Sequence, residues 1–449
     1  MGTYFVWLCF VLAILFALSR PWLGIVAYYF FVFLQPKWNW HYAIPYDFPF
    51  ERYIVIAFVV GALFQGVSPP RVHFMVKLSL FGLVLWLLVG LLGANLSRNT
   101  FVSWALFDQI WKIALVAYFV SVSFCDPDRI RVLLRMSMIA ALYSGYRITD
   151  EYRQIGFCRY VQDGWGFGVG SNQASMTFLG LIMISLSMTL YEKKYIWKGI
   201  AFASFALQSH ALMLFESRSC MLGAICGAAV ILFFAPKTRT NITVLIVSVL
   251  AASILAGPSV IDEFNSMFKS DDEIDLSASS RYDTWSAGMS VFRENPVFGL
   301  GPDMSSSEIP KYMPPEYGLQ YGKSLKNPHN TPIEILCDFG SVGFAGYYLF
   351  VFSVLTTCVF LLRKAKKFEE EPVSLLASAS GLIGILIASF FSSSLMVEVF
   401  YMLVGLGAGG INLIGFYRAP SLVDFEEIVE FRDDDSMRDH FMGEIVVQN

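Results

Sequence analysis

The stretch Asn327-Pro328-His329-Asn330-Thr331-Pro332-Ile333-Glu334 joins a long polar segment to a long apolar one. Three of its residues are typical of the start of a helix. Thr331 supplies a capping hydroxyl, Pro332 stands at the first helical position, and Glu334 follows three residues after the cap. The stretch therefore predicts a helix that begins beside His329 and then enters a membrane.

The composition around this junction is that of a membrane protein. Of 449 residues, 56% are hydrophobic and 15% are charged, whereas soluble domains carry about 25% charged residues. Apolar runs long enough to cross a bilayer recur along the chain. We expect an all-α polytopic membrane protein with about 11 to 13 transmembrane helices, the range reflecting two short apolar runs at the start. The expected spans are residues 2–18, 21–35, 53–67, 74–94, 105–124, 130–148, 173–190, 199–215, 219–235, 241–257, 332–362, 373–392 and 395–417.

The polar segments divide the chain into four regions. Residues 1–257 form the first part of a transmembrane helical bundle, and residues 332–417 form the last part. Between them, residues 258–331 form a large loop outside the cytoplasm that contains short amphipathic helices. Residues 418–449 form an acidic cytoplasmic tail.

Basic residues gather in alternate short loops, which sets the orientation. They are Arg20, Arg71, Arg129, Arg131, Lys193, Lys194, Lys198, Lys237, Arg239, Arg363, Lys364, Lys366 and Lys367. Cytoplasmic loops carry an excess of Lys and Arg, so this set faces the cytoplasm. The large loop at 258–331 then faces outward.

His329 is a candidate general base. It precedes a helix N-terminus, whose partial positive charge disfavours imidazolium and keeps the ring neutral near pH 7. A neutral imidazole can accept a proton, and the same helix end favours an anionic ligand. We interpret Glu334 as a helix-capping residue in preference to a catalytic one. Asp338, one turn further along the helix, is a candidate for a second polar contact.

Two arginines stand out in the predicted outer loops. Arg218 lies in a tight turn between two apolar helices, where a charge suggests function; the alternative is a pair with Glu216. Arg281 opens an amphipathic helix whose Tyr282, Trp285, Met289 and Phe292 form one stripe, as in helices that lie on a lipid surface. The alternative for Arg281 is an interfacial anchor with no chemical role.

The outer loop at 149–172 adds Arg153 and Arg159 beside a glycine-rich run at 164–170, which suggests a cavity lining. The chain has no P-loop, no zinc-protease motif and no serine nucleophile elbow. We interpret the acidic run Asp271-Asp272-Glu273 as a solvated loop in preference to a cation site. We expect no metal site, no cofactor and no nucleic-acid partner. Chemistry outside the cell without ATP requires an activated substrate, such as a sugar linked to a lipid diphosphate.

Three blocks resemble the O-antigen ligase and polymerase superfamily of bacterial inner membranes. The blocks are Ser217-Arg218-Ser219; Arg281-x3-Trp285 with Pro296-x2-Gly299-x-Gly301; and His329-Asn330 followed by Gly340-x2-Gly343. The amino-terminal segment Arg20-Pro21-Trp22-x-Gly24, with Gln35-Pro36 and the aromatic run 38–49, further resembles putative O-glycosylation ligases associated with exosortase and PEP-CTERM systems.

The resemblance implies inverting, metal-independent transfer of a glycan from an undecaprenyl-diphosphate carrier to a hydroxyl acceptor at the periplasmic face of the inner membrane. It implies three catalytic residues: Arg218 and Arg281 hold the diphosphate, and His329 deprotonates the acceptor. Asn330, Arg153, Arg159, Glu334 and Trp285 are the expected substrate-binding residues. The acceptor is a protein, the lipid A core or another polysaccharide.

Two alternatives remain open at this point. A polymerase would use the same donor and similar residues to lengthen a lipid-linked chain. A transporter of lipid-linked glycans would perform no chemistry, but transporters place charged residues near the bilayer midplane, often in inverted repeats. Here the charged candidates, Lys112 excepted, cluster at the predicted outer boundary, which favours an enzyme.

Overall fold

A computed structural model describes most of the chain. The described residues are 2–45, 47–66, 72–159, 161–168, 170–239, 241–244, 246, 276–314, 326–365 and 372–418. Within these ranges the chain is helical and contains no strand, so the predicted all-α fold is confirmed.

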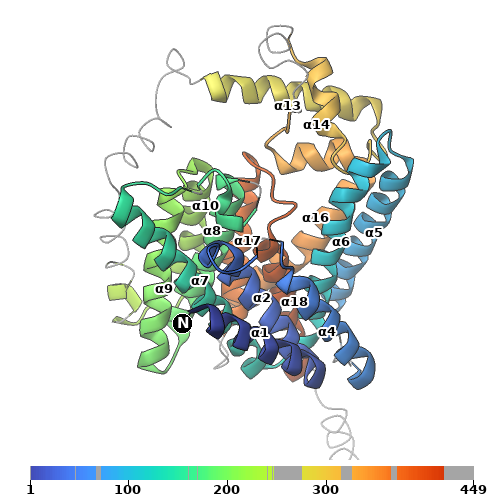
Figure 1. Ribbon diagram of the computed structural model, residues 1–449. Helices are drawn as coiled ribbons and strands as arrows, with labels where there is room; N and C mark the ends of the chain where they lie inside the picture. The colour runs from blue at the N-terminus through green and yellow to red at the C-terminus, as the bar shows by residue number, and fades with distance from the viewer. Residues whose placement is uncertain are drawn as a thin grey trace, which may run out of the picture.

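Figure 1 shows the arrangement of the helices. In chain order they are α1 (Gly2–Ser19), α2 (Pro21–Leu34), α3 (Pro36–Asn39), α4 (Phe50–Gln65), α5 (Phe74–Leu96), α6 (Thr100–Ser123), α7 (Pro127–Ile155), η1 (Gly164–Gly166), α8 (Ser171–Tyr191), α9 (Tyr195–Leu214), α10 (Arg218–Phe234), α13 (Leu276–Glu294), α14 (Ser305–Glu308), η4 (Ile309–Tyr312), α16 (Thr331–Ala365), α17 (Val373–Ser389) and α18 (Glu398–Arg418).

The helix bounds agree with most of the predicted spans to within a few residues. Among the described residues α1, α5, α6, α8 and α16 are long and apolar enough to cross a membrane, and α10, α17 and α18 are shorter apolar helices. The chain is therefore a multi-pass membrane protein. The predicted span at 241–257 lies largely outside the described residues, as does the tail after Arg418.

The start of α6 lies beside the large loop, and its end lies at the opposite end of the bundle. The Ser103 hydroxyl donates a hydrogen bond to the Pro302 carbonyl at 2.8 Å. The whole of α6 has 24 residues and ends at Ser123. At 1.5 Å per residue this is about 36 Å, enough to cross the hydrocarbon core of a bilayer.

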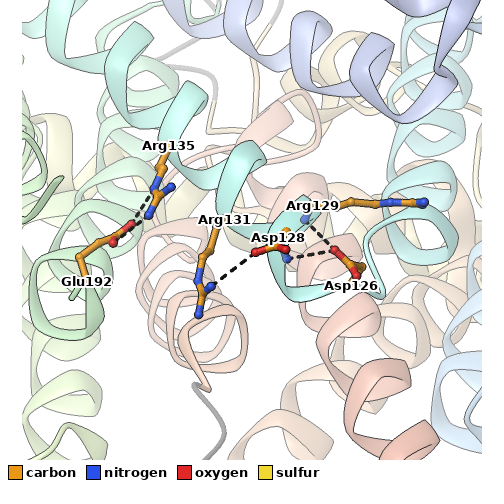
Figure 2. Close-up of polar contacts among 6 residues, drawn as sticks. All are labelled: Asp126, Asp128, Arg129, Arg131, Arg135 and Glu192. Atoms are coloured by element: carbon orange, nitrogen blue, oxygen red, sulfur yellow. Dashed lines mark hydrogen bonds and ion pairs between the residues drawn. The ribbon is translucent and has the colours of Figure 1, made fainter. Parts of the chain in front are cut away.

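Ion pairs gather at this opposite end, and one of them ties α7 to the end of α8 (Figure 2). Arg135 of α7 donates two hydrogen bonds to Glu192, at 2.7 and 2.9 Å, just after α8 ends. Arg131 pairs with Asp128 at 3.5 Å. The end of α6, the start of α7 and the end of α8 therefore meet here, and basic residues of the predicted cytoplasmic loops share this end. Which side of the membrane it faces stays a prediction.

Small residues let two helix pairs approach closely, as in other membrane proteins. α10 and α17 pack with Gly223 against Gly384, and Gly227 lies against the Ser380 carbonyl. These contacts make the helices antiparallel, so α10 starts where α17 ends. α5 and α16 meet where a Cβ on Gly82 would lie 2.6 Å from the Gly346 carbonyl oxygen.

α16 is broken at Gly340, whose backbone angles are φ 65° and ψ −170°. A break leaves backbone amides and carbonyls without their helical partners, and buried groups of this kind need others. The segment that follows α13 supplies them. Leu300 N donates to Cys337 O (2.9 Å), Gly301 N to Asp338 O (2.9 Å), Ser341 N to Pro296 O (2.8 Å) and Val342 N to Val297 O (3.2 Å). We call this contact between residues 296–301 and 337–342 the Gly340 junction.

We predict that Gly340→Ala destabilises the protein. Its backbone angles fall in a region that is open essentially to glycine alone. An added Cβ would also lie 2.6 Å from the amide nitrogen of Gly299 and closer still to the Val297 carbonyl. The loss should be at least ~1–3 kcal/mol, measured as a lower midpoint of thermal unfolding in detergent.

Gly199→Ala is the matched control, because Gly199 lies inside α9 and an added Cβ meets no atom within 4 Å. Its midpoint should stay unchanged or rise slightly, since alanine is the better helix former. Equal midpoints for Gly340→Ala and the wild type would contradict the described junction.

Candidate functional site

α13 lies across the bundle at the end where the large loop emerges (Figure 1). Its Ala287 and Val291 are buried against Ile309 of η4 and Cys337 of α16. The predicted amphipathic helix exists, but it begins at Leu276, and its aromatic stripe is divided: Phe292 packs against this buried cluster, whereas the first residue of the stripe is open to the surroundings. Tyr282 of that stripe is 66% exposed.

The first turn of α16 is capped by Asn330, so the predicted Thr331 cap is wrong. The Asn330 side-chain oxygen accepts a hydrogen bond from Ile333 N at 3.0 Å. The Thr331 hydroxyl donates instead to Ser392 O at 2.9 Å and accepts from Ser394 N at 2.9 Å. The cap moves by one residue because the segment between α17 and α18 occupies the threonine.

Both neighbours of His329 are fixed in place. The indole N–H of Trp285 donates to Pro328 O at 2.9 Å, and the Asn330 side-chain amide donates to Phe390 O at 2.9 Å. Pro328 and Asn330 are buried, whereas the side chain of His329 is exposed. His329 itself has φ 47°, a left-handed conformation that costs a non-glycine residue about 1–3 kcal/mol. Anchors on both sides therefore hold a strained backbone that directs the imidazole outward.

The charge environment favours the neutral imidazole. The protein atoms packed around part of the His329 ring desolvate it and so lower its pKa, and the positive charges of Arg281 and Lys326 lower it further. A lowered pKa agrees with the expected neutral ring. From the sequence the helix N-terminus alone is the expected cause, whereas in the structure the neighbouring cations also contribute. Arg281 of α13 and His329 are therefore close enough to interact electrostatically.

Two buried acids follow in α16. Glu334 is 6% exposed, and its Oε2 has no hydrogen-bond partner among the described residues. The predicted capping box is therefore wrong, since Asn330 caps the helix. Asp338 is 1% exposed and accepts hydrogen bonds from Ser305 N at 2.7 Å and Asp303 N at 3.0 Å. Asp338 thus anchors the start of α14 to α16.

Arg218 is the first residue of α10. The preceding Ser217 donates a hydrogen bond to the Asn172 side chain at 2.8 Å, which ties this start to the start of α8. Because α10 and α17 are antiparallel, Arg218 lies at the level where α17 ends. Phe390, the residue that follows α17, accepts a hydrogen bond from Asn330, so Arg218 and the start of α16 lie at the same end of α17.

Arg153 and Arg159 belong to a different part of the surface. Arg153 pairs with Asp150 at 3.0 Å, and Arg159 pairs with Glu151 at 2.9 Å. These carboxylates lie near the end of α7, which packs against α2, α8 and α9. The described contacts thus join Arg281, Trp285, His329 and Asn330 into one site and hold Arg153 and Arg159 in surface ion pairs.

The segment between α17 and α18 is the part of the site that the sequence analysis missed. Besides binding Asn330 and Thr331, it brings the Phe391 ring to 6.1 Å from the Trp285 ring. The signal was present as a run of three serines, Ser392 to Ser394, between two apolar spans.

Across the described residues, no group of three or more His, Cys, Asp or Glu is placed to hold a metal ion.

These features define a multi-pass membrane protein in which Arg281, Trp285, His329 and Asn330 come together at one end of the helix bundle. Residues 203–348 match the family model described as O-Antigen ligase. The matched range includes Arg218, Arg281, Trp285, His329 and the Gly340 junction. This similarity supports a membrane glycosyltransferase-like function of the ligase or polymerase type. No curated protein matches the chain.

We predict that Asp338→Asn loosens the large loop. The carboxylate accepts two backbone N–H groups, whereas an amide offers one acceptor oxygen and turns a donor toward the second. A buried amide left without a partner costs ~1–3 kcal/mol. Limited proteolysis should therefore cleave residues 303–314 faster in this variant than in the wild type.

The control is Asp163→Asn, because Asp163 is exposed and makes no capping hydrogen bond. It should be cleaved at the wild-type rate. If Asp338→Asn also resisted the protease like the wild type, the anchoring role of Asp338 would be refuted.

Proposed function

We propose that the protein transfers a glycan from an undecaprenyl-diphosphate carrier to a hydroxyl acceptor, with inversion and without a metal ion. The observation that carries this proposal is the exposed imidazole of His329, whose pKa is lowered beside Arg281 at the start of α16. A proton acceptor and a cation then lie together at a helix N-terminus. Similarity to the O-antigen ligase family over residues 203–348 supports the reaction class.

His329 acts on the acceptor. Its neutral ring takes the proton of the acceptor hydroxyl as that oxygen attacks the anomeric carbon of the donor sugar. The new C–O bond forms on the face opposite the diphosphate, which inverts the anomeric configuration. The imidazolium is then discharged to solvent, which the exposed side chain reaches.

The arginines act on the leaving group. As the bond between sugar and diphosphate breaks, its electron pair moves to the phosphate oxygen, and undecaprenyl diphosphate is released. Guanidinium groups bind phosphate oxygens in a bidentate manner and stabilise this growing charge. Arg281 is adjacent to His329, and Arg218 approaches from α10. A diphosphate is a good leaving group, so the reaction needs no carboxylic acid to protonate it.

The other predicted residues have supporting roles. Asn330 and Trp285 hold the backbone on either side of His329, and they position the base. Glu334 offers a buried oxygen one turn into α16 that binds a hydroxyl of the substrate. Arg153 and Arg159 contact the glycan farther from the reacting bond, after exchange of their surface ion pairs.

The reaction takes place at the periplasmic face of the bacterial inner membrane. The basic loops at the opposite end support this orientation through the positive-inside rule. The resemblance of the amino-terminal segment supports a protein hydroxyl as acceptor, in an O-glycosylation system associated with an exosortase.

We predict that purified full-length protein, reconstituted in vesicles with an undecaprenyl-diphosphate glycan, releases undecaprenyl diphosphate only when acceptor is present, and does so equally in EDTA. His329→Ala should lower the rate by about 10²–10⁴, the usual contribution of a general base. Arg281→Gln should lower it by about 10²–10³, as expected when one charge partner of the transition state is lost.

Arg293→Gln is the matched control, since Arg293 is an exposed cation at the other end of α13. It should keep the wild-type rate. Wild-type turnover in His329→Ala, or an absolute requirement for a divalent metal, would refute the proposed mechanism. Growth of the lipid-linked glycan itself, with no transfer to another acceptor, would identify a polymerase.

The lowered pKa of His329 also predicts a pH profile. Because the folded protein favours the neutral ring, kcat/KM should stay level as the pH falls to the usual histidine value near 6.5 and decline only below it. The profile should be measured on vesicles that remain intact over the pH range. A decline that begins above pH 7 would contradict His329 as the base.

A further inference from the structure

A cavity lies at the end of the bundle opposite His329. It has a volume of about 650 Å³, within the usual range for small-molecule sites. The turn between α1 and α2, the end of α4 and the turn between α6 and α7 form its walls. The residues that matter here are Arg20, Trp22, Gln65, Asp126, Asp128 and Arg129.

The acidic residues of this cavity are already engaged (Figure 2). The Asp126 carboxylate caps α7 by accepting hydrogen bonds from the backbone N–H groups of Asp128 and Arg129, at 3.0 and 3.1 Å. Asp128 pairs with Arg131. In Figure 2 the Arg129 guanidinium points away from both carboxylates. The acids therefore leave the Arg129 charge available to a ligand.

Two guanidinium groups and an aromatic ring remain. Arg129 donates to the Ser123 carbonyl at 3.3 Å, and its guanidinium carbon lies 5.5 Å from the centre of the Trp22 ring. Arg20 lines the same cavity and is exposed. In the described part of the chain its side chain has no ion pair and caps no helix. The cavity thus presents two cationic groups that can bind an anion.

The surroundings point to a lipid. Leu63 and Phe64, just before Gln65, are 80% and 87% exposed, and Leu18 beside the first turn is 40% exposed. Apolar side chains this open at the end of transmembrane helices contact acyl chains. The cavity also lies about 36 Å, the length of α6, from the large loop, which places it at the other surface of the bilayer.

We propose that this cavity binds the phosphate headgroup of an anionic phospholipid. Arg20 and Arg129 hold the phosphate, Trp22 and Gln65 contact the glycerol, and the acyl chains lie along the exposed faces of α1 and α4. Basic pockets between transmembrane helices are a known means of lipid recognition. The proposal is independent of glycan transfer, since none of these residues belongs to the site around His329.

The test is stabilisation of the purified full chain by short-chain phosphatidylglycerol in neutral detergent micelles. The midpoint of thermal unfolding should rise with phosphatidylglycerol and change little with phosphatidylcholine or inorganic phosphate. Arg20→Gln should weaken the apparent affinity about fivefold, as should Arg129→Gln. If Arg129→Gln misfolds, Arg20→Gln still tests the proposal, because the Arg20 side chain makes no described contact that folding needs.

Lys194→Gln is the control, an exposed cation at the same end of the bundle that does not line the cavity. It should respond to phosphatidylglycerol as the wild type does. If the double variant Arg20→Gln/Arg129→Gln responded to phosphatidylglycerol as the wild type does, the proposal would be overturned. Equal stabilisation by inorganic phosphate would overturn the assignment to a lipid, and equal stabilisation by phosphatidylcholine would overturn headgroup recognition.

Discussion

At Gly340 the helix α16 breaks, and the segment that follows α13 binds the backbone groups that the break exposes. Side-chain contacts alone would let a helix on the membrane surface slide or roll. Four backbone hydrogen bonds fix the distance and direction between α13 and α16. Asp338 extends the same contact to α14. Gly299 and Gly340 are needed because two backbones meet here with no space for a Cβ, and a Cβ on Gly301 would meet the Gly93 carbonyl of α5.

The candidate site depends on this contact. α13 carries Arg281 and Trp285, and α16 begins just after His329. If α13 moved, Trp285 would release the Pro328 carbonyl, and Arg281 would no longer act on the imidazole. A second contact, between Asn330 and Phe390, links the same point to the end of α17 and so to the start of α10. Arg218 and His329 thereby belong to one framework although they are far apart in the sequence.

Much of the fold could be predicted because transmembrane helices have a strong sequence signal. The long apolar runs gave helix bounds near those observed for α5, α6 and α8. The start of α16 was predicted at Pro332, one residue after the observed start at Thr331, and its cap was assigned to Thr331 in place of Asn330. Local sequence patterns make Thr331 and Asn330 nearly equivalent as caps, and only the distant Ser392 and Ser394 decide between them.

The site was only partly predictable, because several of its contacts join segments that are distant in the sequence. Residue type and local position singled out His329, Arg218 and Arg281 as candidates, and the resemblance supplied their expected roles. The break at Gly340, the unpaired oxygen of Glu334 and the contact of Trp285 with Pro328 depend on segments that meet only in the folded chain. Arg153 and Arg159 were expected to bind substrate, but the nearby acids Asp150 and Glu151 hold them in ion pairs. A count of positive charges in the sequence does not reveal these pairs.

Hydrogen–deuterium exchange of the full chain in lipid nanodiscs tests the central claim most directly. If the Gly340 junction holds α13 on α16, the amides of Leu300 and Gly301 exchange slowly, as members of a stable structure, because they are bound to Cys337 O and Asp338 O. Exchange of these two amides at the rate of an unstructured peptide, in protein whose α16 remains protected, would contradict the account.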